Sequence, residues 1–171
     1  MKPRGLYLIL IFSLVIGGIG LLALNASQYS DVGSLAELDR DLRVTVSGDV
    51  VPVGYGEFKL VVAGKEYIVE GRGPFGIAKP VSGDGEEYAV FILKGSNGFK
   101  VAALYPAEEF VAKYGLNPVV DTVIVVDGIY RAGLEAYIES GGDMEDIGVL
   151  EVLSILKGCH SAYQQPRANL A

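Results

Sequence analysis

Short runs of apolar and β-branched residues, separated by glycine- and proline-rich turns, recur between residues 42 and 156 and constrain the fold most. Five runs have the length and residue types of principal strands. They cover residues 42–51, 88–93, 99–104, 122–126 and 150–156. A further hairpin is expected from residues 57–62 and 66–70, around Ala63-Gly64-Lys65.

A single helix is expected between the third and fourth principal strands. It opens at Pro106 with Glu108 and Glu109, which suit a first helical turn, and it closes near Gly115. Residues 71–87 and 132–148 are rich in glycine and are expected to be loops. Strands and helices do not alternate, which argues against a parallel sheet. The sequence therefore predicts an all-β fold, a five-stranded OB-type Greek-key barrel with one short helix, and we expect the barrel to be closed and antiparallel.

The N-terminal residues 6–24 contain no charged side chain. As a helix they are long enough to cross the hydrocarbon core of a bilayer. Lys2 and Arg4 precede this run and acidic residues follow it, so the positive-inside tendency leaves the N-terminus in the cytoplasm. We expect a transmembrane anchor at 1–24 and an exported domain at 25–157, a single-pass protein of the cell membrane. A cleaved signal peptide is the alternative, although the apolar run is long for one.

Composition excludes several classes of function. Two of the 14 basic residues precede the exported part and all 21 acidic residues lie within it, so its formal charge is −9 (12 − 21). This balance argues against nucleic-acid binding, which needs a basic surface. One cysteine and one histidine exclude a zinc site built on these two residue types. No phosphate-binding loop or nucleophile elbow is present, and we do not expect an enzyme.

The only cysteine and the only histidine are adjacent, Cys159 and His160, where the last strand meets a polar tail at 158–171 that we expect to be flexible. In an exported protein a lone thiol is reactive or intermolecular. A buried, inert Cys159 is the alternative, but its neighbours are small or polar. Tyr163 follows by four residues, about 6 Å away if the tail makes a helical turn. A thiol could then bond a porphyrin edge while phenol or imidazole meets the iron.

The tail resembles that of the cytochrome c maturation haem chaperones, the E component of the maturation system. Ile155-Leu156 precedes Cys159-x-x-x-Tyr163, with Pro166 beyond, and one branch of the family has this Cys-x-x-x-Tyr in place of His-x-x-x-Tyr. The resemblance extends more weakly over the barrel, in the order Gly48, Pro106, Phe110, Gly115 and Val125-Val126-x-Gly128. It implies an N-terminal signal anchor, an exported OB barrel and a flexible tail.

By this resemblance Cys159 is the covalent haem attachment point and Tyr163 an axial iron ligand. The chain departs from the family in a longer helix, in an inserted 57–70 hairpin and in His160, which is an alternative ligand for the iron or the ring. The implied protein is a carrier that binds haem transiently and delivers it to apocytochrome c. Its partners would be membrane complexes for haem delivery and haem ligation.

Two other functions remain open from the residues. Leu156 to His160 is half of a C-x-x-C-H attachment motif, with leucine at the first cysteine, which is consistent with an electron-transfer protein holding haem by one thioether. An anchored OB-fold interaction module without a cofactor is the other. A Soret band in purified protein would exclude the haem-free module, and turnover of the haem would separate the two haem proteins.

Overall fold

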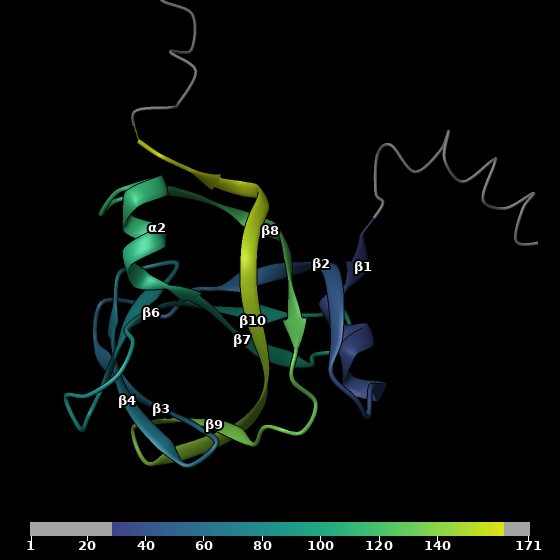
Figure 1. Cartoon of the computed structure of the whole chain (residues 1–171), viewed down its shortest axis with the longest axis horizontal. Helices are drawn as coiled ribbons and strands as arrows, with labels where there is room; N and C mark the ends of the chain where they lie inside the picture. Colours follow the sequence, from purple (N-terminus) through teal and green to yellow (C-terminus); the bar gives the residue numbers. More distant parts are fainter. Residues whose placement is uncertain (1–28, 163–171) are drawn as a thin grey trace, which may run out of the picture.

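The structure is a computed structural model that describes residues 29–162 (Figure 1). This part of the chain is mostly β. It also contains a 3₁₀ helix at Val32–Glu37 and one α-helix, α2, at Ala107–Tyr114. No helix within residues 29–162 is long and apolar enough to cross a membrane. The anchor predicted at 1–24 lies outside the described residues.

Ten strands occur between residues 29 and 162, most of them short and separated by tight turns. They are β1 (Ser30–Asp31), β2 (Leu42–Val51), β3 (Glu57–Val62), β4 (Lys65–Gly71), β5 (Gly76–Pro80), β6 (Tyr88–Lys94), β7 (Lys100–Pro106), β8 (Val119–Tyr130), β9 (Ala136–Ser140) and β10 (Asp143–His160). All belong to one continuous sheet, which closes on itself twice because β2 also pairs with β6 and β10 also pairs with β9.

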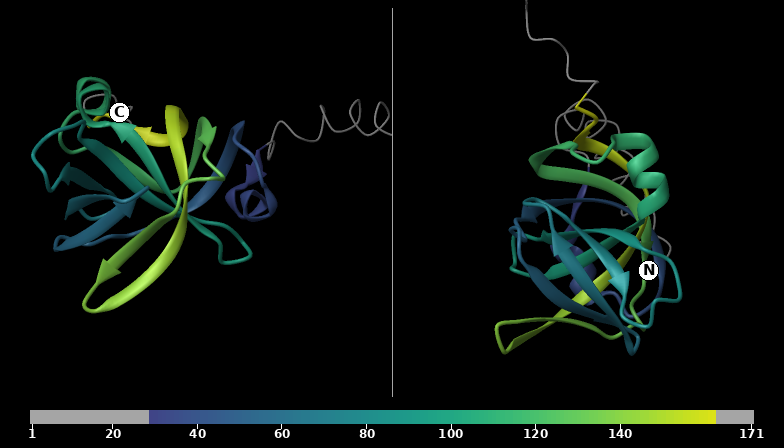
Figure 2. Two further views of the ribbon diagram at one scale, coloured as in Figure 1. Left: turned by 60° about the horizontal axis from the view of Figure 1, so that its bottom comes forward. Right: turned by 90° about the vertical axis from the view of Figure 1, so that its left-hand side faces the viewer.

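The first closed circuit, here called the first ring, follows the pairings β2–β8–β10–β7–β6 and back to β2. The second ring follows β10–β7–β6–β5–β4–β3–β9 and back to β10. Strands β6, β7 and β10 therefore belong to both rings. The strands β3, β4 and β9 lie together at the bottom of Figure 1, and α2 lies at the top beside the end of β10. In the two further views of Figure 2, β10 is the long strand whose colour changes from yellow-green to yellow, and it runs past the strands of both rings.

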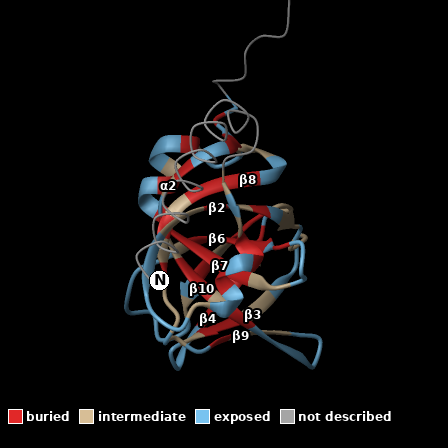
Figure 3. Ribbon diagram, turned by 90° about the vertical axis from the view of Figure 1, so that its right-hand side faces the viewer, coloured by how far each residue is buried: buried red, intermediate tan, exposed pale blue. Residues whose placement is uncertain are grey.

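Each ring has its own hydrophobic core, and the shared strands serve both. In β6, Phe91 and Leu93 belong to the core of the first ring, whereas Val90 and Ile92 belong to that of the second. Successive side chains of a strand point to opposite faces, so a strand buried on both faces must be apolar at every position. This explains the unbroken apolar runs in β6 and β7, whose central residues are buried (Figure 3).

The five predicted strands, the 57–70 hairpin and the helix are confirmed. The prediction of loops at 71–87 and 132–148 is wrong, because these segments contain β5, β9 and the first part of β10. With β3 and β4 these strands complete the second ring, so the hairpin is part of a second core rather than an appendage. The expectation of purely antiparallel pairing also fails, since β10 runs parallel to β7 over residues 148–151.

We predict that Leu150→Ala lowers the free energy of unfolding by about 2–5 kcal/mol, because it leaves a cavity in the first core. Leu150 is fully buried on β10 (0 % exposed). Leu153→Ala is the matched control on the same strand. Leu153 is 48 % exposed, and its truncation should change stability by no more than about 0.5 kcal/mol. Urea unfolding followed by circular dichroism measures both. Equal effects would contradict this assignment of inward and outward positions.

Candidate functional site

The end of β10 carries the two residues that the sequence singles out. Strand β10 continues to His160, so Gly158, Cys159 and His160 lie within the strand rather than in a tail beginning at 158. Cys159 pairs with Val120 and His160 with Val119 at the start of β8. The described chain ends two residues later, and Tyr163 lies outside it.

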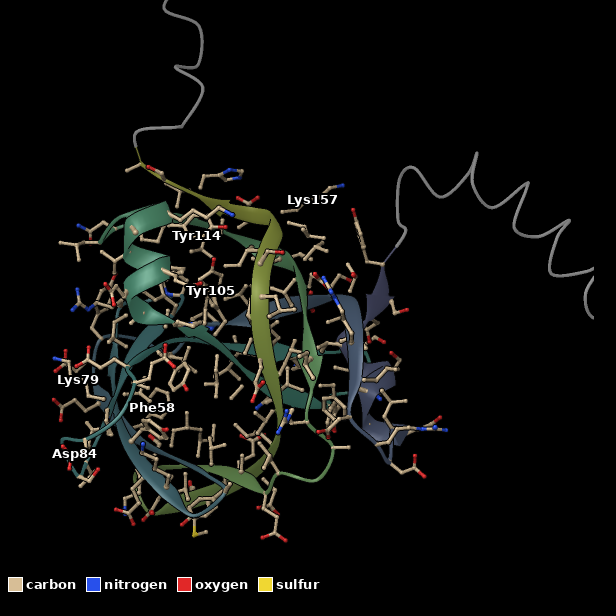
Figure 4. All side chains as sticks on the ribbon, viewed as in Figure 1. Phe58, Lys79, Asp84, Tyr105, Tyr114 and Lys157 are labelled. Carbon is tan, nitrogen blue, oxygen red and sulfur yellow. The ribbon has the colours of Figure 1, made fainter. Side chains whose placement is uncertain are left out.

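Cys159 is a free thiol whose residue is 8 % exposed, and it belongs to the core of the first ring. The same core includes an aromatic cluster formed by α2 and β7. Phe110 contacts Tyr114 with ring centroids 5.2 Å apart, and Tyr105 packs on Phe110 at 5.8 Å. Tyr105 and Tyr114 lie beside α2 and below the end of β10 in Figure 4. The Tyr114 hydroxyl donates a long hydrogen bond of 3.4 Å to the carbonyl oxygen of Ile155, which ties α2 to β10.

The surroundings of the thiol oppose its ionisation. The pKa of Cys159 is raised to about 12, mainly by burial and to a lesser extent by the carboxylate of Asp121, while the ammonium of Lys113 acts in the opposite direction. Burial also raises the pKa of Tyr114 to about 12, with a smaller contribution from Cys159. Because the thiolate is the nucleophilic form of cysteine, the thiol is inert while β10 stays paired to its end. In the folded state Cys159 is thus the buried small hydrophobe that the sequence analysis disfavoured.

His160 has the opposite orientation. Its side chain is 51 % exposed, and its Nε2 lies 3.7 Å from Oδ2 of Asp121, which is 57 % exposed. Adjacent residues of a strand point to opposite faces, which places the imidazole outside and the thiol inside. Cys159 and His160 are therefore neighbours in the sequence, but their side chains lie on opposite sides of the sheet.

The pairing at this end of β10 is irregular. Its register with β8 shifts between Val152 and Ser154, between Ile155 and Lys157, and again between Lys157 and Cys159. Gly158 has a φ of +89°, a conformation that favours glycine. A Cβ at Gly158 would also collide with the carbonyl oxygen of Val123. Only the Cys159–Val120 and His160–Val119 pairings lie beyond the last irregularity.

The donor set suits haem in its chemistry. A thiol can form a thioether to the ring edge, and imidazole is a common iron ligand. The geometry is less favourable, because only His160 is exposed in the paired state. Cys159 is buried, and a ligand could reach it only if residues 158–160 separated from β8. Within residues 29–162 no group of three or more His, Cys, Asp or Glu side chains could hold a metal ion. Tyr163, the predicted axial ligand, is not placed by the structure.

Sequence reasoning missed three residues of this site: Gly158, Asp121 and Tyr114. A glycine just before the cysteine is a local signal for an unusual backbone conformation. Asp121 and Tyr114 carry no such signal, since they reach Cys159 through β8 and α2.

Comparison of the chain with protein-family models, with curated proteins and with solved structures finds no significant match in any of the three.

The buried thiol makes folding stability depend on pH. An unfolded chain ionises its thiol near the ordinary pKa of 9.0, whereas the folded chain keeps the proton up to about pH 12. The unfolded state therefore binds fewer protons between these values, and stability must fall as pH rises through this window. We expect urea unfolding to show a larger loss of stability from pH 8 to pH 10 in the wild type than in Cys159→Ala. Tyrosines with a raised pKa contribute to the pH dependence of stability in both proteins. Equal losses of stability in the wild type and in Cys159→Ala would therefore contradict burial of the thiol.

Proposed function

We propose that this protein is a membrane-anchored haem chaperone of cytochrome c maturation. It holds haem transiently on the extracytoplasmic side of the cell membrane and passes it to apocytochrome c. The protein acts as a carrier and not as an enzyme. Its partners are membrane complexes that deliver haem to it and ligate haem to the cytochrome.

The observation that carries the proposal is the position of Cys159 and His160. A single strand, β10, brings both residues to the end of the first ring, beside the aromatic cluster of α2 and β7 and just before the C-terminal segment. We take the first ring to be an OB-type Greek-key barrel. Its five strands, with the one α-helix between β7 and β8, have the order expected of that fold.

In this proposal Cys159 provides the covalent bond and Tyr163 an axial ligand, with His160 as an alternative ligand. Haem, when bound, would supply vinyl carbons and an iron. Cys159 would hold the ring through a thioether, with its sulfur on one vinyl carbon and its hydrogen on the other, and Tyr163 or His160 would hold the iron. The end of β10 must first separate from β8, which brings the thiol from a pKa of about 12 toward its ordinary value. Burial in the core of the first ring keeps the unloaded thiol protonated.

Burial of Cys159 is also the observation that favours the second candidate, an anchored OB-fold interaction module without a cofactor. A thiol that is 8 % exposed is an ordinary core residue in such a protein.

The experiment that separates the two is purification of the full chain from cells that synthesise haem and export it. For the chaperone we expect a Soret band and an intact mass increased by one haem, located by peptide mapping on residues 158–163. The carrier role further requires that the haem leaves the protein when apocytochrome c and the ligation machinery are added. Absence of a Soret band under haem-replete conditions would leave the interaction module as the function. Haem that is bound but permanently retained would favour electron transfer.

A further inference from the structure

The described chain begins beside the end of β10. Tyr29, its first residue, lies with its ring centroid 5.4 Å from Nζ of Lys157. Only residues 25–28 separate Tyr29 from Leu24, the last residue of the uncharged run. Five extended residue steps span at most roughly 18 Å. The surface around Lys157 is therefore held close to the point where that run ends.

Three large apolar side chains are exposed on the strands that form this surface. Val123 on β8 and Leu153 and Leu156 on β10 are 46–48 % exposed, and β8 and β10 are paired neighbours. They make up three of the eight exposed large hydrophobic residues between residues 29 and 162. Leu156 directly precedes Lys157. The other five exposed large hydrophobic residues are dispersed over different elements, for example Val81 after β5 and Met144 at the start of β10.

Tyr29 and Lys157 are of residue types that are common at a membrane–water interface. Tyrosine and lysine place their polar ends in water and their apolar parts against lipid. Figure 4 shows Lys157 at the upper end of β10, on the side of the molecule where β1 begins. The exported part carries an excess of acidic residues, so general electrostatic attraction to anionic lipid cannot hold it at a membrane. Contact at this surface must be local and apolar.

We propose that the outer face of β8 and β10, formed by Val123, Leu153, Leu156 and Lys157 with Tyr29, rests on the headgroup–acyl boundary of the bilayer. This inference rests on the proposed function, because it requires residues 6–24 to be a membrane anchor. Cys159 and His160 follow Lys157 by two and three residues, so this orientation turns the attachment end of β10 toward the membrane. Haem, an apolar ring with polar edges, would then reach the protein along the lipid surface.

The chain contains no tryptophan, so a single introduced tryptophan reports on one position alone. The full-length variants Leu156→Trp and Val123→Trp are reconstituted into phosphatidylcholine vesicles with and without brominated acyl chains. Interfacial side chains enter a bilayer by about 5–10 Å, so bromine should quench about half or more of the emission at both positions. The controls Met144→Trp and Val81→Trp, at residues 62 % and 54 % exposed, should keep their emission.

Equal, weak quenching at all four positions in protein that floats with the vesicles would overturn the proposed orientation while leaving the anchor and the haem function intact. Failure of the full chain to float would overturn the anchor and the orientation together. A blue shift of Leu156→Trp that is independent of bromine and grows with protein concentration would assign this face to a second copy of the chain, which also overturns the lipid contact.

Discussion

Cys159→Ala should abolish the haem that survives denaturing electrophoresis, whereas His160→Ala should retain it. A neutral thiol is a better nucleophile than imidazole toward an activated vinyl carbon, and only two residue pairs join the end of β10 to β8 beyond its last irregularity. Haem staining of denatured protein, together with intact mass to count the adducts, measures the covalent haem. In Cys159→Ala we expect its loss to be nearly complete. His160→Ala should at most change the rate of loading or the ligation of the iron.

Tyr163→Phe is the matched variant for iron ligation. It removes one hydroxyl and should leave the covalent bond intact while shifting the Soret band, because a phenolate ligand is lost. Because His160 is exposed, it is the alternative attachment residue that this set of variants tests. If covalent haem persists in Cys159→Ala and disappears in His160→Ala, the histidine is the attachment residue and the buried cysteine serves only to pack the end of the first ring.

Gly158→Ala should make the thiol of Cys159 react with iodoacetamide at least about fivefold faster than in the wild type. A non-glycine residue in the left-handed region costs about 1–2 kcal/mol, which alone corresponds to roughly 5–30-fold more of the open state. The collision of the new Cβ with the carbonyl oxygen of Val123 adds to this. In the wild type, modification at pH 8 should be slower than in the urea-unfolded chain by roughly a hundredfold or more, because the paired state holds almost no thiolate.

Gly142→Ala is the control for backbone strain by itself. Gly142 has a φ of +90° in the turn between β9 and β10, and no atom lies within 4 Å of its Cβ position. This substitution should destabilise its own turn and leave the reactivity of Cys159 unchanged. A wild-type thiol that reacts as fast in the folded as in the unfolded chain would show that the end of β10 is not closed. If opening limits loading, Gly158→Ala should also acquire covalent haem faster than Gly142→Ala.

Periodicity in the sequence was sufficient to predict the all-β class, the five principal strands and the helix. Apolar runs such as those in β6 and β7 are recognisable because each residue is buried on one face or the other, and α2 carries acidic residues in its first turn. The short strands β5 and β9 were not predictable in this way. Their strand character depends on partners far away in the chain: β5 on β4 and β6, and β9 on β3 and β10.

The sequence by itself also identified Cys159 and His160, since each is the only residue of its kind and both follow the last strand run. Only the tertiary structure decided which of the two faces the core. A strand alternates its faces with a period of two, so each irregularity of one residue exchanges inside and outside. Three register shifts, the first two of one residue and the third of three, separate Val152 from Cys159. Beyond them the thiol lies in the core with the aromatic cluster and the imidazole lies in solvent. These shifts arise from the fit of β10 against β8, and residue types along β10 alone do not encode them.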